Sequence, residues 1–264
     1  MNKLLTNDKR GGGKHLNYRS LLGKIIGKIY PGYNLAFWCF ASIIKWGRFP
    51  RKFIVDMDKK LVYLNNPKVA CSSVKKSIFG KHPDIHAYAD RYTVNELSGE
   101  MKQYYKFTFV RNPYKRLVSC FEDKCLQHPD DICWNYYFLS RFLRTRNFDS
   151  FIRKVSLIPD SMAEPHFSGQ YRLVYDKKGV CLVDFVGRIE NINKEYDPIR
   201  ERFDLSPLET TNRAASLTGK NWMDYYTPFT AWLVYRKYKK DFVFFGYEEE
   251  YKNLKTYLKS KKSV

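Results

Sequence analysis

The stretch LVYLNNPKVACSSVKKSIF, residues 61–79, carries the pattern on which the fold prediction depends. It opens with a short apolar run, 61–64, which is typical of a buried strand. Asn-Asn-Pro at 65–67 predicts a loop, and a helix is expected from about 72 to 79. A loop at a helix N-terminus directs several backbone N–H groups at one point, and the helix dipole adds positive potential there. The stretch therefore predicts an anion-binding strand–loop–helix unit.

The loop supplies side chains that suit a phosphate or sulfate group. Lys68 adds a full positive charge, and Ser72 and Ser73 add hydroxyl donors. The residues expected to line the site are Lys68, Val69, Ala70, Cys71, Ser72 and Ser73. The Gly-x-x-x-x-Gly-Lys pattern of a Walker A loop is absent. Taken alone, the unit is also compatible with an ordinary connection that carries a surface lysine.

A second strand, predicted at 107–110, runs into the sequence RNPYKRLVS, residues 111–119. Arg111 stands at the end of this strand, and its planar guanidinium suits a phosphate dianion. A proline opens the helix that is predicted over 114–127, and Ser119 lies two turns into it. Two anion sites at neighbouring strand ends match a ligand with two separated phosphates.

Strands and helices alternate along the rest of the chain. A further strand is predicted at 182–186. Further helices are predicted at 132–144, 147–155, 192–203, 227–238 and 248–260. This alternation predicts an α/β fold, a P-loop-like three-layer sandwich with a central parallel sheet flanked by helices. Ligands of such sheets bind beyond the carboxyl ends of the strands, where Lys68 and Arg111 are expected to meet.

The composition indicates an anionic partner. In 264 residues, Lys and Arg number 47 against 27 Asp and Glu, a net charge of +20. Such an excess speeds the capture of anions, but charge alone does not separate nucleic acid, an anionic membrane and a phosphorylated or sulfated small molecule. The length suits one α/β domain with a small appendage. We expect an N-terminal extension at 1–50 and the catalytic domain at 51–264.

The N-terminal extension contains an amphipathic pattern. Apolar residues recur at helical spacing between 21 and 29, with basic residues among them. The pattern predicts a basic helix, and residues 19–45 are expected to touch an anionic membrane surface or to pack on the domain's own core. The uncharged run 29–44 is short for a membrane span, and no secretory signal is evident. The expected location is the cytoplasm, at the inner membrane face, or the Golgi membrane in a eukaryote.

The two loops together resemble those of a known enzyme family. PKVACSS at 67–73 and VRNPYKRLVS at 110–119 resemble the 5′-phosphosulfate loop and the 3′-phosphate motif of PAPS-dependent sulfotransferases, PAPS being 3′-phosphoadenosine 5′-phosphosulfate. The likeness is to the carbohydrate branch, with the chondroitin 4-O-, dermatan, HNK-1 and heparan sulfate 2-O-sulfotransferases. Asn112 stands where that branch has an acidic residue.

Three further blocks follow in the order of the family. They are EPHF at 164–167, DFVGRIEN at 184–191 and DFVFFGY at 241–247, the last expected as a closing strand or turn. The blocks cover roughly residues 60–247. Residues 1–50 lie outside the resemblance.

The resemblance implies a role for each predicted site residue. Lys68 would contact the 5′-phosphosulfate and its bridging oxygen, and residues 69–73 would complete the cradle. The remaining nucleotide contacts are expected from Arg111 and Ser119 at the 3′-phosphate and from Arg188 and Lys220 near the adenine. PAPS is the implied donor, and PAP, the desulfated nucleotide, is the product. No metal is expected because sulfate carries less charge than phosphate.

A general base must take the proton of the accepting hydroxyl. His86 lies between the two phosphate loops, at a place similar to the catalytic histidine of the heparan sulfate 2-O-sulfotransferase, and is the preferred candidate. His166, in the block 164–167, is the second candidate, and Glu164 is a third. Either histidine can instead be structural.

The predicted reaction is sulfuryl transfer from PAPS to a hydroxyl of a carbohydrate acceptor, and the basic surface suits an anionic glycan. One alternative is a P-loop-like kinase or another nucleotide-phosphate transferase, which predicts Walker A glycines. The other is a basic nucleic-acid-binding protein, which predicts a helix-turn-helix, zinc-finger or RRM-like signature. Neither pattern is present, so no nucleic-acid partner is expected.

Overall fold

The computed structural model describes residues 50–128, 143–161, 163–209 and 218–261. These residues belong to one compact unit, which comprises 47–131 and 143–264. The segment expected to touch a membrane, 19–45, lies outside the described residues, as does most of the helix predicted at 132–144.

The sheet has five strands in the order β3-β1-β2-β4-β5. The strands are β1 (Phe53–Asp56), β2 (Leu61–Leu64), β3 (Thr93–Val94), β4 (Tyr105–Val110) and β5 (Phe185–Arg188). β2, β4 and β5 are parallel, as predicted, but β1 is antiparallel to both β2 and β3. The prediction of a wholly parallel sheet is therefore wrong at one edge. A four-residue turn at 57–60 joins β1 to β2, and a connection that short permits only an antiparallel pair.

The third predicted strand begins later than expected. Cys181 forms an isolated bridge with Tyr175, and the amide of Leu182 bonds to Val174. Pairing with β4 starts only where the Asp184 amide donates to the Lys106 carbonyl, at 2.8 Å. The first residues of the predicted strand 182–186 are thus used by a local turn, and β5 runs from 185 to 188.

Nine α-helices lie in the described part of the chain. They are α3 (Cys71–Phe79), α4 (Ile85–Asp90), α5 (Pro113–Phe121), α7 (Phe148–Leu157), α8 (Gln170–Val174), α9 (Ile192–Arg202), α10 (Pro228–Lys237), α11 (Lys239–Phe244) and α12 (Glu248–Ser260). The block 241–247, expected as a strand or turn, forms the end of α11 and the turn after it, so the strand alternative is wrong. The helix buries Phe242 and Asp241, and both Asp241 carboxylate oxygens accept amides at the start of α8.

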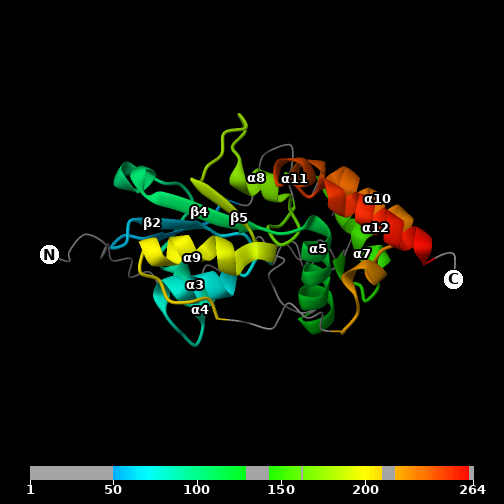
Figure 1. Ribbon diagram of the computed structural model, residues 1–264, viewed down its shortest axis with the longest axis horizontal. Helices are drawn as coiled ribbons and strands as arrows, with labels where there is room; N and C mark the ends of the chain where they lie inside the picture. Colours follow the sequence, from blue (N-terminus) through cyan, green and yellow to red (C-terminus); the bar gives the residue numbers. More distant parts are fainter. Residues whose placement is uncertain (1–49, 129–142, 162, 210–217, 262–264) are drawn as a thin grey trace, which may run out of the picture. The chain divides into compact units, whose positions relative to one another are not determined.

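β2 and β4 have continuous apolar sequences because residues on both of their faces are buried. Alternate residues of both strands point into a cluster with α3 and α9, which lie on the same side of the sheet in Figure 1. Its strand members include Leu61, Tyr63, Phe107 and Phe109. The intervening residues, such as Val62 and Thr108, are buried on the other face. Both faces of the sheet are therefore covered, as a parallel sheet requires.

The register brings several loops to one edge of the sheet. Val110, the last residue of β4, pairs with Arg188 at the end of β5. Phe53, the first residue of β1, pairs with Leu64 at the end of β2 and with Val94 at the end of β3. The edge beyond the carboxyl ends of the parallel strands therefore also receives the segment before β1 and the segment after β3.

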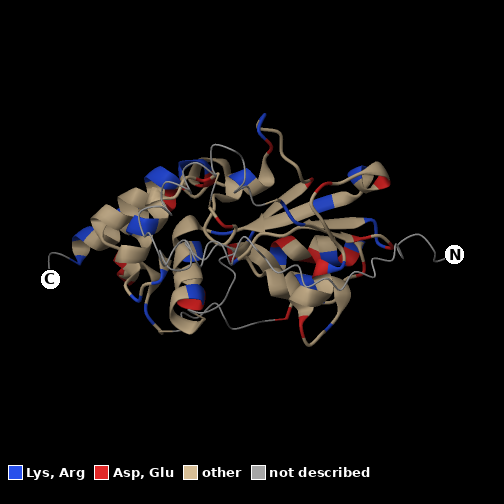
Figure 2. Cartoon of the chain, turned by 180° about the vertical axis from the view of Figure 1, so that it is seen from behind, with Lys and Arg blue, Asp and Glu red and all other residues tan. Residues whose placement is uncertain are grey.

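Basic residues lie on most of the described elements, with acidic residues among them (Figure 2). Within the described ranges, no helix combines the length and the apolar character that crossing a bilayer requires.

Candidate functional site

The first loop has an unusual backbone for residues other than glycine. Lys68 and Ala70 have φ values of 68° and 49°, in the left-handed region, while Val69 between them is fully buried. Side chains rarely adopt this conformation, and such strain concentrates at functional sites. Helix α3 starts directly after Ala70 without a side-chain cap. In the described part of the chain, the amides of 69–72 have no acceptor, which is the arrangement of an anion cradle.

The side chain of Lys68 is held by a residue that the sequence analysis did not single out. Its Nζ lies 2.8 Å from Oδ2 of Asp123, and the two side chains are 15% and 25% exposed. Burial alone raises the pKa of the Asp123 carboxyl, but the charge and hydrogen bond of Lys68, with a contribution from Lys124, outweigh burial and lower it. Asp123 is therefore an ionised partner that competes with any anionic ligand for the Lys68 ammonium.

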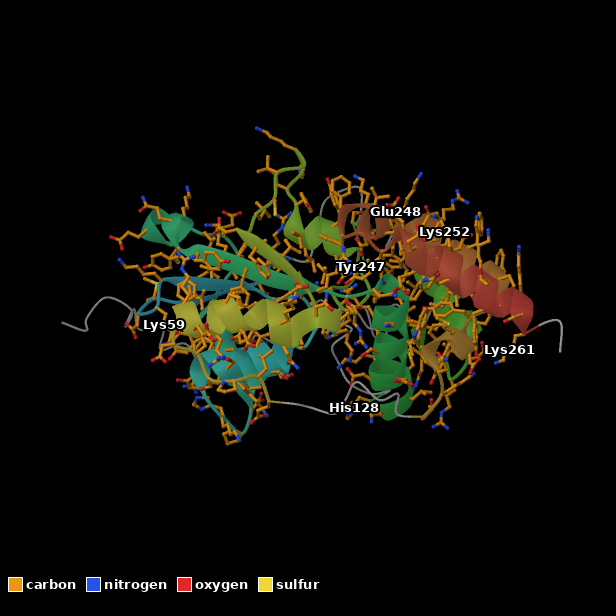
Figure 3. All side chains as sticks on the ribbon, in the orientation of Figure 1. Lys59, His128, Tyr247, Glu248, Lys252 and Lys261 are labelled. Atoms are coloured by element: carbon orange, nitrogen blue, oxygen red, sulfur yellow. The ribbon has the colours of Figure 1, made fainter. Side chains whose placement is uncertain are left out.

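A change of helix type places Asp123. Helix α5 continues as a π-helical turn, η2 (Glu122–Gln127), in which the amide of His128 donates to the Asp123 carbonyl at 2.9 Å. His128 marks its end in Figure 3. The π turn changes the direction in which side chains leave the helix, and such turns are frequent at functional sites. Asp123 lies four residues after Ser119, so helical spacing places both on the same face of the helix. This spacing could have identified Asp123 from the sequence.

The second loop touches the first, as expected for neighbouring strand ends. Nη1 of Arg111 donates to the Lys68 carbonyl at 3.1 Å. Gln170 fixes the Arg111 backbone from both sides, because its Oε1 accepts the Arg111 amide at 2.9 Å and its Nε2 donates to the Arg111 carbonyl at 2.8 Å. Burial lowers the pKa of the Arg111 guanidinium, and nearby Glu190 opposes that effect.

Arg116 joins the first loop to the block 164–167. Its side chain is buried, and it donates to the carbonyls of Pro67 at 3.2 Å, Ser168 at 2.7 Å and Pro165 at 2.5 Å. A fourth, longer contact of 3.4 Å reaches Oδ1 of Asn66. One guanidinium thus holds two segments that are about a hundred residues apart in the sequence.

We expect Arg116→Met to lower the free energy of unfolding by about 3–5 kcal/mol, because it leaves several buried acceptors without a donor. Urea unfolding of the variant and the wild type measures this difference. Arg146→Met, at an exposed position, is the control and should change stability by less than about 0.5 kcal/mol. A loss below about 1 kcal/mol at Arg116 would contradict the bridging role.

His86 has both ring nitrogens engaged. Its Nδ1 lies 3.1 Å from Nζ of Lys75, and its Nε2 lies 2.9 Å from Oγ of Ser72. An ammonium group only donates, so Nδ1 accepts from Lys75 and Nε2–H donates to Ser72. Burial, and then the charge of Lys75, lower the pKa of His86. The lone pair that a base would use is therefore taken up by Lys75.

His166 is arranged differently. Its Nδ1 lies 2.7 and 2.9 Å from the two oxygens of the buried Glu164 carboxylate, which also accepts the His166 amide at 2.9 Å. Because a carboxylate only accepts, Nδ1 carries the proton and Nε2 the lone pair. Within the described ranges, Nε2 has no partner. His166 follows Pro165, whose carbonyl accepts from the same Arg116 guanidinium that donates to Pro67 of the first loop.

Because the pKa of His86 is lowered in the folded state, the stability of the fold should depend on pH. The unfolded state, with a histidine pKa of about 6.5, binds the proton first as the pH falls, so folding stability is lost on acidification below that value. We expect His86→Gln to flatten the fall of the melting temperature between about pH 6.5 and 5. Thermal melts of both proteins across this range test it, and equal slopes would contradict it.

The remaining predicted site residues are Ser119, Arg188 and Lys220. Ser119 is half-buried on α5. The guanidinium of Arg188 stands 5.2 Å from the Tyr247 ring. Nζ of Lys220 lies 4.8 Å from the ring of Tyr225. Among the described residues, the structure shows no contact between Lys220 and another predicted site residue.

Glu190 links the third block to the second loop. Its Oε1 accepts the amide of Asn112 at 3.0 Å, and its Oε2 accepts the hydroxyl of Tyr247 at 2.7 Å. Tyr247 lies near the middle of the view in Figure 3. The sequence pattern of block 184–191 did not indicate this role for Glu190.

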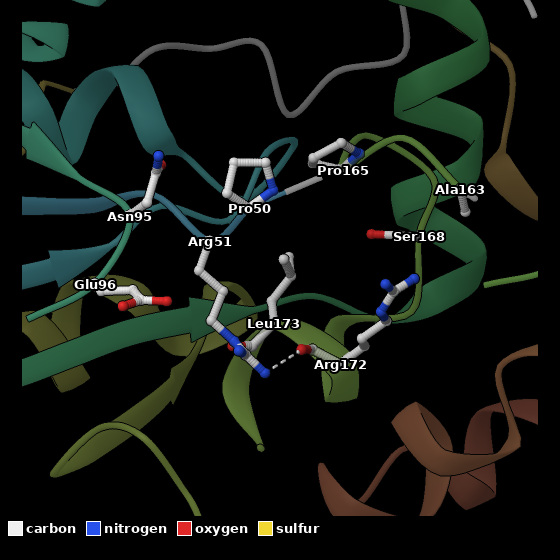
Figure 4. Close-up of a pocket in the computed structure, with 9 residues that line it drawn as sticks. All are labelled: Pro50, Arg51, Asn95, Glu96, Ala163, Pro165, Ser168, Arg172 and Leu173. Carbon is white, nitrogen blue, oxygen red and sulfur yellow. Dashed lines mark hydrogen bonds between the residues drawn. The ribbon is translucent and has the colours of Figure 1, made fainter. Parts of the chain in front are cut away.

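A cavity of about 280 Å³ opens at the same edge of the sheet (Figure 4). It is lined by Pro50, Arg51, Asn95, Glu96, Ala163, Pro165, Ser168, Arg172 and Leu173. These residues come from the segment before β1, the segment after β3, and the stretch that contains His166. Sequence reasoning did not identify the cavity because no local pattern marks it.

The family model described as "Sulfotransferase family" matches residues 51–248. Carbohydrate sulfotransferase 11 of Mus musculus is 24% identical over 237 residues, which cover 75% of this chain and 67% of that protein. Carbohydrate sulfotransferase 12 of Xenopus laevis is 26% identical over 252 residues, 74% of this chain and 59% of that protein. Carbohydrate sulfotransferase 10 of Homo sapiens matches over 98 residues at 26% identity, 35% of this chain and 26% of that protein. No solved structure matches the chain.

Proposed function

This chain belongs to the sulfotransferase family, and we propose that it transfers the sulfuryl group of PAPS to a hydroxyl of a carbohydrate. The observation that carries the proposal is the meeting of Lys68 and Arg111 beyond two parallel strands, next to amides that have no acceptor among the described residues. Two cationic side chains that follow neighbouring parallel strands suit a nucleotide with phosphates at both ends. The relatives, named as carbohydrate sulfotransferases, support the acceptor class.

The donor site is proposed residue by residue. Lys68 and the cradle 69–73 bind the phosphosulfate end, and Arg111 with Ser119 binds the 3′-phosphate. Arg188 and Lys220 are proposed to lie near the adenine of the nucleotide. The P-loop-like three-layer arrangement is proposed for this half of the sheet, and 51–264 is proposed as the transferase domain, with 1–50 as an extension. The start of the family match at residue 51 supports that boundary.

The chain's own groups perform three tasks in the proposed reaction. PAPS supplies the sulfuryl group, and the acceptor oxygen forms a bond to sulfur as the bond from sulfur to the bridging phosphate oxygen breaks. Lys68 neutralises the charge that develops on that leaving oxygen. The ammonium has three donors, so it can contact the donor while Asp123 holds it in position. The products are a sulfate ester and PAP, and no step of this scheme uses a metal.

The proton of the accepting hydroxyl goes to Nε2 of His166 in this proposal. The Glu164 carboxylate orients the ring and stabilises the imidazolium that forms. His86, the preferred candidate from the sequence, is instead proposed to hold Ser72 and Lys75 in place, because its lone pair is engaged. The pairing with a buried carboxylate is what reverses the order of the two candidates.

An anionic glycan is the proposed acceptor, supported by the net charge of +20. The expected cytoplasmic or membrane-surface location and the membrane contact of 19–45 stay predictions.

Two measurements test the proposed function. PAP should raise the melting temperature in proportion to its concentration over its dissociation constant, whereas ATP with Mg²⁺ and duplex DNA should not. Incubation with ³⁵S-labelled PAPS and a panel of glycans should then label at least one of them. Stabilisation by ATP with Mg²⁺ alone would favour a kinase and overturn the proposal, and stabilisation by DNA alone would favour a nucleic-acid-binding protein.

A further inference from the structure

The order of the strands sets a direction along the proposed donor. Lys68 follows β2, Arg111 follows β4 and Arg188 ends β5, and these three strands are consecutive in the sheet. If the proposed function holds, the phosphosulfate end lies at β2 and the nucleotide extends toward β5. The neighbouring strands on the other side of β2, which are β1 and then β3, are left without a role in donor binding.

The cavity of about 280 Å³ lies on that other side. Pro50 and Arg51 precede β1, and Asn95 and Glu96 follow β3. The pairing of Phe53 with the last residues of β2 and β3 places both segments at the edge where Lys68 lies. The cavity is therefore beyond the phosphosulfate end of the donor, on the side opposite the nucleoside.

Transfer in line requires the attacking oxygen to approach sulfur from the side opposite the leaving phosphate. We propose that this cavity binds the sugar unit of an anionic glycan that carries the accepting hydroxyl, with Arg172 facing its carboxylate or sulfate group. The inference rests on the proposed function and adds to it the position and the charge of the acceptor.

The walls of the cavity suit a sugar ring. Glu96, Asn95 and Arg172 provide acceptors and donors for hydroxyl groups, while Pro165 and Leu173 provide apolar surface for C–H faces (Figure 4). The volume is near the lower end of small-molecule sites, which start at about 300 Å³.

The two arginines of the cavity differ in what they contact. Arg51 donates to the carbonyls of Leu173, Arg172 and Tyr175 at 2.9, 3.0 and 2.6 Å, so it builds the wall at the end of α8. The Arg172 guanidinium lines the cavity, and its Nη2 donates to the Ser161 carbonyl at 3.4 Å. A carboxylate or sulfate group offers a guanidinium a stronger, bidentate partner than a carbonyl does.

The cavity is also tied to the proposed catalytic groups. Arg116 donates to Pro165 in the cavity wall and to Pro67 in the donor loop, so one side chain sets the position of both. His166 is the residue after Pro165. The proposed base and the cavity wall are therefore consecutive residues of one rigidly held segment.

The test uses the full chain and variants at the rim of the cavity. Asn95→Trp should obstruct it, and Arg172→Gln should remove the guanidinium. The acceptor probes are unsulfated chondroitin, heparosan and a neutral N-acetyllactosamine oligosaccharide. Asn193→Trp, at an exposed position of α9, is the matched control. Transfer from labelled PAPS gives the acceptor KM, and calorimetry with PAP gives the donor affinity.

We expect Asn95→Trp to raise the acceptor KM at least tenfold while the Kd for PAP stays within about twofold of wild type. Arg172→Gln should raise KM for the anionic probes and leave the neutral one within about twofold. An unchanged KM in Asn95→Trp, or a parallel loss of PAP affinity, overturns the inference while the proposed function stands. A wild-type chain that neither binds PAP nor labels any probe overturns the proposed function and this inference with it.

Discussion

Replacing Lys68 with methionine is expected to lower the rate of sulfuryl transfer by roughly 10³-fold. In the proposed reaction Lys68 neutralises the leaving phosphate oxygen, and methionine keeps the volume of the stem without the charge. The affinity for PAP should fall less, by about tenfold, because Arg111 and the backbone amides remain. Single-turnover rates with labelled PAPS and calorimetry with PAP separate the two effects.

Removal of the ammonium also leaves the Asp123 carboxylate without its partner at 2.8 Å. The double variant Lys68→Met with Asp123→Asn is therefore the appropriate comparison, since it removes the orphaned charge. Both proteins should show the same loss of rate. If the double variant regains transfer to within tenfold of wild type, the effect arises from Asp123 and the role assigned to Lys68 is wrong.

Replacing His166 with glutamine is expected to lower the transfer rate by about 10²–10⁴-fold, the usual contribution of a general base. Glutamine keeps polar contacts near Glu164 but cannot take the proton of the accepting hydroxyl. The Kd for PAP should stay within about twofold, because His166 makes no donor contact in the proposal. The rate at saturating acceptor and donor is the quantity to measure.

His86→Gln is the matched comparison, since it makes the same substitution at the other candidate. We expect it to cost less than about tenfold in rate, through a small displacement of Ser72. The opposite order, with His86→Gln inactive and His166→Gln active, would return the base to His86. If Glu164→Gln loses more transfer rate than His86→Gln but less than His166→Gln, the result would further support orientation of the His166 ring by the Glu164 carboxylate.

Local patterns predicted much of the fold. The strand–loop–helix units at 61–79 and 107–127 depend on contiguous apolar runs, a proline and helical spacing, so the residues themselves indicate them. The antiparallel strand β1 was missed because FIVD, residues 53–56, has no alternation of its own, and its pairing depends on the turn that follows. The late start of β5 likewise follows from a competing bridge to Tyr175.

The candidate site likewise has a part that the sequence predicts and a part that depends on the folded structure. The proximity of Lys68 and Arg111 follows from strand order, which sequence reasoning can supply. The contacts of Gln170 and Arg116 join segments that are about 50 residues or more apart in the sequence. No local sequence pattern predicts such contacts. The order of the two histidines depends on which partner each ring meets, Lys75 or Glu164, and that is a property of the folded chain.

The left-handed backbone at Lys68 and Ala70 narrows the replacements that this loop can accept. Glycine or asparagine fits such a conformation at position 70, whereas a branched valine or threonine would strain it. Position 68 combines that backbone demand with the ammonium group that the proposed reaction uses, and glycine would meet the first while losing the second. The backbone of this loop thus limits the residues that it can accept before any chemistry is considered, and Lys68 holds its position at a cost in conformational strain.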